Sequence, residues 1–322
     1  MVSVQFFSAV VQVLTCLGLL DLEARKWFTL MSVMLLPTLL IINAPFGRFT
    51  PNNQKSLLIV DGIKSWIVME LVSPMTFLYT FYTSPLTTWR PPIQWNSPNS
   101  ILAMCFLVHY ANRAIINPLR TPSRSKSHII VPLSAVAFNL VNGSLMGAYL
   151  SSPYARIFCG ASSTQFYMGL TLWAFGFIGN IIHDEILLDI RRKANSKGKG
   201  KAEGGEHYAI PQGGLYTLVS YPNYLCEWIE WLGFAIAASP FPFALDSISI
   251  PSIASVLDPK FYTTIITEPG YLFAPNLSPP WIFLLSEILL MLPRAYRGHQ
   301  WYKSRFGNSY PRGRKAVIPF VF

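Results

Sequence analysis

Three polar side chains interrupt an apolar stretch that follows the turn at residues 211–214. They are Asn223, Glu227 and Glu230, and their spacing of four and then three residues places them on one face of a helix. A carboxylate inside a membrane helix is costly, so it usually faces a polar cavity or a partner group. The alternative is an interfacial helix whose acids lie in water, which the two neighbouring tryptophans also suit.

Two further residues interrupt apolar runs with groups that can donate a hydrogen bond. Glu70 lies in WIVMELVSP, and Tyr110 follows the run that begins at residue 101. A buried protonated carboxyl and a phenol can both stabilise negative charge that develops on a ketone oxygen. Conjugate reduction of an enone requires this, since hydride reaches the β-carbon and a proton then reaches the α-carbon. Each residue also has a structural interpretation, as an interfacial acid and as an interfacial aromatic anchor.

A third polar set closes a later apolar run. Asn180, Asp184 and Arg191 are spaced to share one helical face. A lone carboxylate beside a basic loop can simply pair with a neighbouring cation, so Asp184 could pair with Arg191 or Arg192. Earlier in the chain Arg113, Arg120 and Arg124 are consistent either with solvated cytosolic charge or with contacts to phosphate.

The composition is that of a membrane protein. The chain has 322 residues, of which 52% are hydrophobic and 12% charged, and its mean hydropathy is +0.37. Soluble domains carry about 25% charged residues. The sequence therefore predicts an all-α polytopic membrane helix bundle. It has no CxxC pair, Walker motif, strand-linked GxGxxG, metal-ligand spacing or nucleic-acid-binding module, so we expect neither a metal nor a nucleic-acid partner.

Eight apolar runs could cross the bilayer, which takes about 20 residues per helix. They cover residues 4–20, 27–43, 66–86, 101–116, 129–150, 166–190, 215–238 and 281–292, and seven spans remain if the first run lies on the membrane surface. The net charge of +10 gathers at 113–126, 191–201 and 294–315. Since basic loops mark the cytosolic side, we expect these three there and the Pro- and Ser-rich stretch 239–280 as a long non-cytosolic loop.

Residues 210–233 resemble the steroid 5α-reductase family, whose pattern there is close to IPQGG-[LF]-[FY]-x-x-V-S-x-x-N-[FY]-x-x-E-x-x-E-W-x-G. The tail resembles the family's ending, in which R-A-x-x-x-H-x-W-Y is followed by Y-P-x-x-R-K. Shorter family patterns surround Glu70, Tyr110, Asn142 and Asn180. The resemblance covers about residues 47–322, so residues 1–46 are expected as extra N-terminal membrane segments, and the 239–280 loop as an insertion.

The resemblance implies a reductase that uses NADPH to reduce the C=C bond of an α,β-unsaturated ketone in a steroid, sterol or other terpenoid-like lipid. It places Glu70 and Tyr110 at the substrate carbonyl. It implies cofactor contacts from Arg120, Asn180, Asp184, Arg191, Tyr208, Asn223, Glu227, Arg294, His299, Tyr302 and Arg314. The expected location is the endoplasmic reticulum membrane, with the cofactor taken from the cytosol and a lipophilic substrate from the bilayer.

Other activities fit parts of the pattern. An enoyl-thioester or polyprenol reductase would share the fold and the cofactor. An isoprenylcysteine-type methyltransferase also has a short basic, aromatic ending, but it would use S-adenosylmethionine and has no need for Glu70 and Tyr110. A transporter whose acids line a path leaves the turn at 211–214 and the spacing of the tail unexplained.

Overall fold

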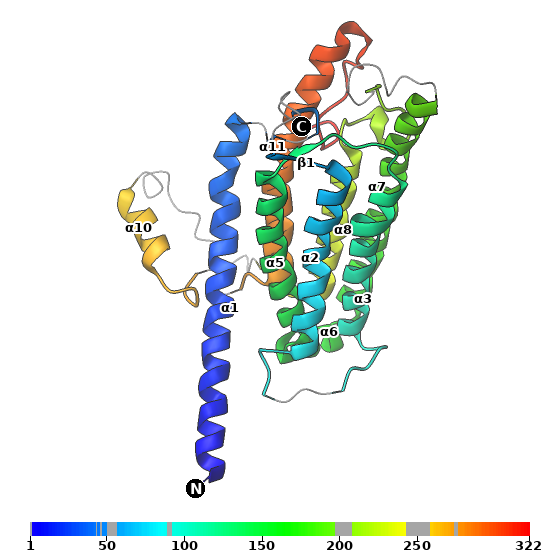
Figure 1. Cartoon of the computed structure of the whole chain (residues 1–322). Helices are drawn as coiled ribbons and strands as arrows, with labels where there is room; N and C mark the ends of the chain where they lie inside the picture. The colour runs from blue at the N-terminus through cyan, green and yellow to red at the C-terminus, as the bar shows by residue number, and fades with distance from the viewer. Residues whose placement is uncertain are drawn as a thin grey trace.

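The computed structural model describes residues 2–42, 44–45, 47–49, 57–88, 92–196, 208–242, 258–273 and 276–322. These residues are mostly helical, as predicted, and seven helices of 13 residues or more form the body of the molecule (Figure 1). The seven are α1 (Val2–Ile41), α2 (Gly62–Thr83), α3 (Pro98–Tyr110), α5 (Ile130–Ser151), α7 (Ser163–Ser196), α8 (Pro222–Ala238) and α11 (Pro279–Phe306). Shorter helices are α4 (Asn117–Arg120), α6 (Pro153–Ala161) and α10 (Pro259–Thr267). Strands β1 (Ile59–Val60) and β2 (Ser127–His128) pair antiparallel, with Ile59 opposite His128.

Two pairs of helices pack with their backbones in close contact. Between α7 and α8, a Cβ atom added to Gly176 would lie 2.2 Å from the backbone nitrogen of Glu230. Between α5 and α2, a Cβ atom added to Gly143 would lie 2.2 Å from the carbonyl oxygen of Ser73. Small residues at helix contacts are typical of membrane proteins, where backbones approach closely. These contacts fix the faces of α2, α7 and α8 that carry the polar side chains.

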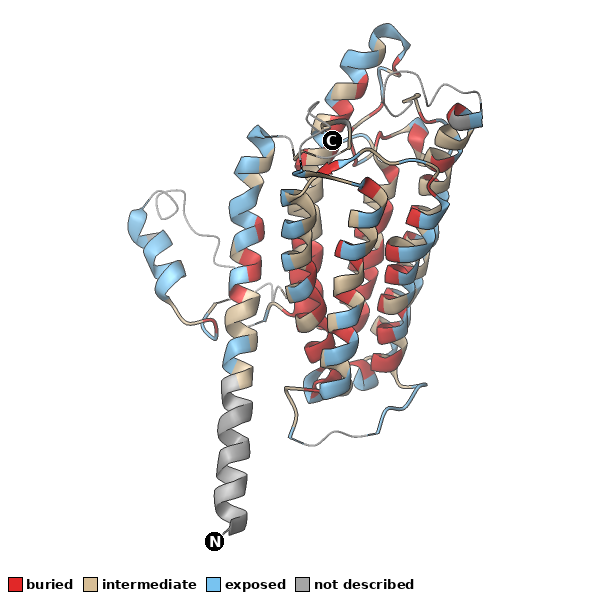
Figure 2. Cartoon of the chain, in the orientation of Figure 1, coloured by how far each residue is buried: buried red, intermediate tan, exposed pale blue. Residues whose placement is uncertain are grey.

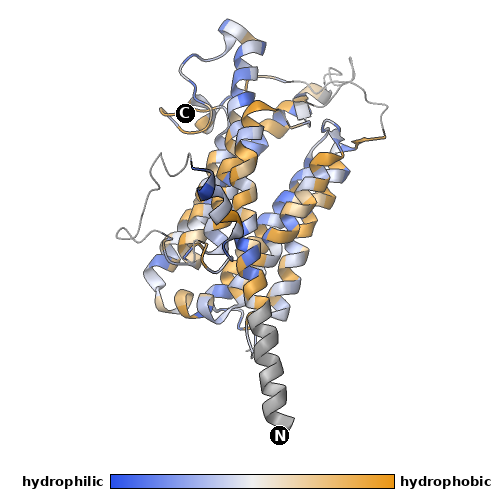
Figure 3. Ribbon diagram, turned by 90° about the vertical axis from the view of Figure 1, so that its left-hand side faces the viewer, coloured by the Kyte–Doolittle hydropathy of each residue, from blue (hydrophilic) through white to orange (hydrophobic). Residues whose placement is uncertain are grey.

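Three helices are long and apolar enough to cross a membrane within the described chain: Leu17–Ile41, Ile130–Ser151 and Ser163–Ala194. Many large apolar residues are exposed, and Figure 2 shows exposed residues along the outside of the bundle. Figure 3 shows apolar residues along the bundle helices and hydrophilic residues toward the far end of α11. The protein is therefore built as a membrane protein, while the number of spans stays a prediction.

The N-terminal helix corrects one expectation. The apolar runs 4–20 and 27–43 were expected as two segments, but the first run and residues 27–41 of the second belong to the single 40-residue helix α1. The charged residues between the runs do not break a helix, because none of them is Gly or Pro. At about 1.5 Å per residue α1 is about 60 Å long, twice the hydrocarbon thickness of about 30 Å. The two runs thus supply one crossing at most.

The run 215–238 is α-helical only from Pro222 onward, and Gly214–Thr217 before it form a short 3-10 helix. The turn before it is not α-helical, as expected from its glycines, and Gly213 and Gly214 have φ angles of 97° and 52°. The N–H groups of Ser220 and Tyr221 donate to carbonyl oxygens of the tail around Ala316 instead of to a helix. Proline suits the first position of a helix, so α8 begins where this pairing with the tail ends.

The helix that contains the last apolar run extends well beyond that run. The run at 281–292 continues through Pro293 to Phe306, where α11 ends. Of the expected 239–280 loop, residues 243–257 and 274–275 lie outside the described residues. The described part contains α10 and a turn that packs against α1.

Candidate active site

The polar face of α8 points into the bundle. Glu227 and Glu230 are buried, with 2% and 0% of their surface exposed. Glu230 is hydrogen-bonded to His109 of α3, and Oε1 of Glu230 lies 2.7 Å from Nδ1 of His109. The prediction that these acids face polar partners is confirmed, and the alternative in which they face water is wrong.

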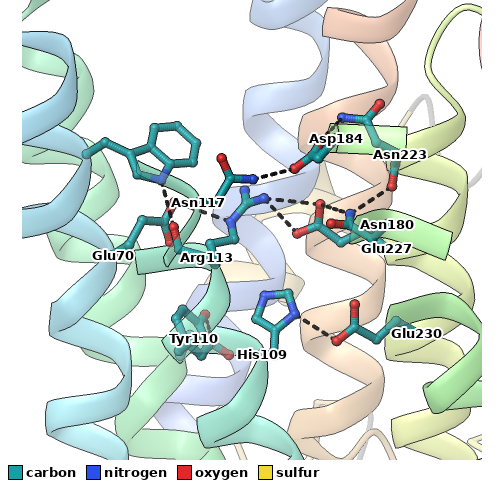
Figure 4. A network of polar contacts seen from close by, with 12 residues as sticks. Glu70, His109, Tyr110, Arg113, Asn117, Asn180, Asp184, Asn223, Glu227 and Glu230 are labelled. Carbon is teal, nitrogen blue, oxygen red and sulfur yellow. Dashed lines mark hydrogen bonds and ion pairs between the residues drawn. The ribbon is translucent and has the colours of Figure 1, made fainter. Parts of the chain in front are cut away.

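Arg113 lies at the centre of the buried polar network (Figure 4). Its Nη1 is 3.1 Å from Oε1 of Glu227, and its Nε is 3.5 Å from Oε1 of Glu70. One cation therefore joins an acid of α2 to an acid of α8. From the sequence, Arg113 was interpreted either as a solvated charge or as a phosphate contact. The structure instead pairs it with two carboxylates.

The backbone that carries Arg113 has an unusual conformation. Residues Ala111–Ile116 form a π-helix directly after α3, and the N–H of Asn117 donates to the carbonyl of Asn112, five residues earlier. A π-helical turn widens the helix and is frequent at functional sites. Here it lies between Tyr110 and Asn117, and Asn117 points into the network toward Asp184 (Figure 4).

A second part of the network joins α7 to α8. Asp184 accepts hydrogen bonds from Asn117 at 2.8 Å and from Asn223 at 3.0 Å. Asn180 donates to the carbonyl of Asn223 at 3.0 Å and to Oε2 of Glu227 at 3.4 Å. The structure thus brings together Asn180, Asp184, Asn223 and Glu227, as their spacing predicts. Asp184 pairs with amides rather than with Arg192, whose ion pairs go to Glu185 and Asp189.

The two candidate carbonyl ligands lie on neighbouring helices. The hydroxyl of Tyr110 accepts a hydrogen bond from Nδ2 of Asn142 at 3.2 Å, and the same nitrogen bonds Oγ of Ser73 at 3.3 Å. Ser73 is one turn of α2 beyond Glu70, so Asn142 links Tyr110 to the helix that carries Glu70. Their joint contact with a substrate stays a prediction.

Several cations gather beside this network. The guanidinium of Arg124 lies 3.5 Å from the centre of the Trp66 ring, and Arg113 lies over the same ring at 5.1 Å. Burial lowers the pKa of Arg124, and the nearby charges of Arg191 and Arg294 lower it further. Arginine nonetheless stays protonated at neutral pH, so this cluster attracts an anion such as a phosphate. Arg120 lies apart from it, paired with Glu185 at 2.8 Å.

The tail forms a third cluster around Ser220. Its Oγ lies 2.6 Å from Nδ1 of His299 and 2.5 Å from the hydroxyl of Tyr310. Burial, followed by nearby cations that include Arg314, lowers the pKa of His299 to about 4, so its ring is neutral at pH 7. The rings of Tyr302 and Tyr310 stack with centroids 5.7 Å apart.

The remaining predicted residues lie at the edges of this cluster. Tyr208 packs edge-on against Trp301 at 4.9 Å. Arg314 is 2% exposed, and its Nε and Nη1 have no hydrogen-bond partner among the described residues. In the network, Oδ1 of Asn223 is likewise buried without a partner. Buried polar atoms without partners are rare, and here they offer one acceptor and two donors to a bound ligand.

Some side chains of the buried network were not assigned from sequence. Asn117 and the pairing of Arg113 with carboxylates were missed, because both residues follow an apolar run in a segment rich in cations. The acids in the apolar runs could have indicated such partners, since buried carboxylates need a cation or an amide beside them.

Comparisons with known proteins give concordant matches. A family model described as 3-oxo-5-alpha-steroid 4-dehydrogenase matches residues 125–251 and 253–322. The chain is 36% identical over 311 residues to "Uncharacterized protein C9.08c" of Schizosaccharomyces pombe, covering 92% of this chain and 97% of the relative. It is 28% identical over 282 residues to 3-oxo-5-alpha-steroid 4-dehydrogenase 1 of Rattus norvegicus, covering 87% of each. It is 28% identical over 302 residues to steroid 5-alpha-reductase DET2 of Solanum lycopersicum, covering 90% and 93%.

Proposed function

Because the chain belongs to the 3-oxo-5-alpha-steroid 4-dehydrogenase family, whose members are oxidoreductases acting on CH–CH groups, we propose that it uses NADPH to reduce a lipid enone. The substrate is an α,β-unsaturated ketone of a steroid, sterol or other terpenoid-like lipid. The observation that carries the proposal is the buried network in which Arg113 joins Glu70 to Glu227, with Tyr110 held nearby on α3 by its hydrogen bond from Asn142.

The residues present fit a phosphorylated nicotinamide cofactor. The unpartnered Oδ1 of Asn223 can accept a hydrogen bond from a carboxamide or a ribose hydroxyl, and the unpartnered nitrogens of Arg314 can donate to a phosphate. Asn180, Asp184 and Glu227 would line the nicotinamide side. The cations Arg124, Arg191 and Arg294, with the tail around His299, would hold the phosphates. When bound, NADPH would supply the hydride.

The chain's own residues act on the carbonyl oxygen. Nδ2 of Asn142 donates to the oxygen of Tyr110, so the phenolic proton is left for another acceptor, namely the ketone. The carboxyl group of Glu70 would supply a second hydrogen bond to the same oxygen, through the carboxyl oxygen that is not paired with Arg113. Both hydrogen bonds strengthen as negative charge develops, which is the condition for lowering the barrier. Burial inside an apolar bundle excludes water and strengthens these interactions.

The protein's expected setting follows from its charges. The cation cluster, the tail and the loop that carries Arg124 lie at one end of the bundle, which we assign to the cytosol because basic residues mark that side. The lipophilic substrate would enter from the bilayer, and the membrane would be that of the endoplasmic reticulum.

The test uses the purified full chain in lipid nanodiscs. NADPH should raise its melting temperature more than NADH or S-adenosylmethionine does, because a ligand that binds the folded state stabilises it. Steroid and terpenoid enones should gain two hydrogens, detected by mass spectrometry. If S-adenosylmethionine alone stabilised the protein, the reductase proposal would be wrong and a methyltransferase would be favoured. If the protein reduced enoyl thioesters alone, the proposed enone substrate would be wrong.

A further inference from the structure

Glu287 is an acid of α11 that lies within the apolar run 281–292. It is half-buried, and its carboxyl group forms no hydrogen bond or ion pair with any part of the chain that the structure describes. Acids within apolar helices of membrane proteins usually face the interior, pair with another group, and mark substrate or proton paths. Because Glu287 has no such pair within the described chain, a structural role does not account for an acid at this position.

The direction of the Glu287 side chain follows from the way α11 packs on α8. Directly before α11, the hydroxyl of Ser278 donates to the hydroxyl of Ser239, directly after α8, with the two oxygens 2.8 Å apart. Toward the other end of α11, a Cβ atom added to Gly298 would overlap the hydroxyl of Tyr221, directly before α8. The two helices are therefore antiparallel neighbours.

An aromatic contact sets the level of Glu287. The ring of Phe283 lies 4.6 Å from the ring of Trp231 of α8 and 6.2 Å from the ring of Phe138 of α5, measured between centroids. Glu287 follows Phe283 by four residues and Glu227 precedes Trp231 by four, so each acid stands one turn, about 6 Å, from this contact on the same side of its helix. Since the helices are antiparallel, both turns lead toward the same end. Glu287 therefore faces Glu227 between α5 and α8.

The charges that act on Glu287 are those of the buried network. They belong to Glu227, Arg113, Glu70 and Glu230. Glu287 is also close enough to interact electrostatically with the phenol of Tyr110. Arg113 is already paired with Glu70 and Glu227, so it is not a free partner for a third carboxylate. A charged group inside an apolar structure is costly without a partner of its own, and it is neutralised instead. We therefore expect Glu287 to carry a proton in the resting protein.

The proposed reduction needs a proton that Glu70 and Tyr110 do not supply. Both act on the ketone oxygen, where negative charge develops as hydride reaches the β-carbon, whereas the α-carbon must also gain a hydrogen. A proton donor for this carbon has to lie inside the bundle near the two oxygen ligands, hold a proton before the reaction, and come from a separate helix. Glu287 meets these three conditions.

We propose that Glu287 is the general acid that protonates the α-carbon, an inference that rests on the proposed reductase function. After hydride adds to the β-carbon, the electron pair of the enolate forms a new C–H bond with the carboxyl proton of Glu287, and the C=O bond forms again. Glu287 is left as a carboxylate near Arg113, and it regains its proton from water, which reaches it because it is only half-buried.

The first experiment compares Glu287→Gln with the wild type, as full chains in lipid nanodiscs with NADPH and a steroid enone in D2O. We expect kcat to fall about 10²–10⁴-fold, the usual contribution of a general acid, while the Kd for NADPH stays unchanged. The wild type should place deuterium on one face of the α-carbon, and Glu287→Gln on both faces, because water then protonates the enolate. The control Asp189→Asn removes an exposed acid of α7 and should change neither result.

A second variant, Glu287→Asp, keeps the acid but shortens its reach by one methylene group. It should lose less of kcat than Glu287→Gln and should keep deuterium on one face, a rescue that a purely structural role would not produce. Equal losses in the two variants, with deuterium on one face in both, would overturn the proposal.

Infrared spectroscopy tests the resting proton without any substrate. The spectrum of the wild type minus that of Glu287→Gln should contain the carbonyl band of a protonated carboxyl group, which moves to lower frequency in D2O. A carboxylate band in its place would overturn the proposal, because an ionised Glu287 has no proton to give.

The kinetic results also separate this inference from the function on which it rests. If wild type and Glu287→Gln reduce the enone at equal rates, the role of Glu287 is wrong and the proposed function stands. If the wild type reduces no enone, the proposed function is wrong, and the role of Glu287 with it.

Discussion

The Nδ2 amide of Asn142 donates a hydrogen bond to the phenolic oxygen of Tyr110 across 3.2 Å. Because α5 and α2 are in backbone contact beside this amide, Asn142 has little freedom to move. It fixes the position of the Tyr110 oxygen, and in the proposed reaction the phenolic O–H would donate to the ketone. The hydrogen-bonding state of Tyr110 is thus set by packing on a different helix.

Substitution of either carbonyl donor should depress turnover more than cofactor binding. For Tyr110→Phe we expect a loss of about 10²–10³ in kcat, the usual effect of removing one oxyanion donor. Glu70→Gln should be milder, because an amide still donates a hydrogen bond. The measurements are kcat for enone reduction and the Kd for NADPH. Wild-type rates in both variants would refute the enone mechanism.

Removal of Arg113 should destabilise the fold. Arg113→Met leaves Glu70 and Glu227 without their shared cation, and breaking a buried ion pair costs about 3–5 kcal/mol. The matched control is Arg120→Met, whose ion pair with Glu185 is exposed and worth about 0–1 kcal/mol. Thermal unfolding in one detergent compares the two, and similar melting temperatures would contradict the central position of Arg113.

Loss of the buried donors of Arg314 should weaken NADPH binding. Arg314→Gln removes a charge-assisted hydrogen bond, and we expect the Kd to rise roughly ten- to a hundredfold. The exposed Arg312, changed to Gln, serves as the control. Turnover at saturating NADPH should fall little. An unchanged Kd would remove the tail from the cofactor site.

Two glycine substitutions should have opposite effects on stability. Gly176→Ala forces a methyl group toward the backbone of α8, and overpacking of this kind costs about 1–3 kcal/mol. Gly160→Ala meets no atom within 4 Å and lies in α6, where Ala is favoured over Gly by up to about 1 kcal/mol. Melting temperatures that fall together would contradict the tight contact between α7 and α8.

Tags should reveal the orientation in the membrane. Tags near Lys199 and after Phe322 should be reached by an impermeant reagent from the cytosol, and a tag near Ser249 should not, because basic segments stay on that side. The readout is labelling of intact and of permeabilised microsomes. Cytosolic labelling at Ser249 would contradict the assigned topology.

The sequence predicted the faces of helices better than their ends. The spacing of Asn223 and Glu227 indicated one buried face, and the structure confirms it, because buried polar groups leave a clear pattern in an apolar run. The start of α8 was wrong by seven residues, from 215 to 222, since the competing pairing of Ser220 with the tail is a long-range contact. Local hydropathy carries no information about such a contact.

The position of Arg113 could not be predicted for a related reason. A π-helical turn depends on the packing of its surroundings, so its sequence, ANRAII, gives no periodic signal for it. The continuous α1 was missed because its charged middle was interpreted as a boundary between segments. Lys26 instead finds carbonyl partners in α10, a segment 240 residues later in the chain.

The glycine contacts divide the bundle into two units that cannot separate internally. One unit is α7 with α8, which carries Asp184 and Glu227, and the other is α2 with α5, which carries Glu70 and Asn142. Since neither pair can loosen without losing backbone contact, any widening of the bundle would occur at the seam between the pairs. Arg113 bridges that seam on its π-helical turn, so its ion pairs with Glu70 and Glu227 hold the two units together.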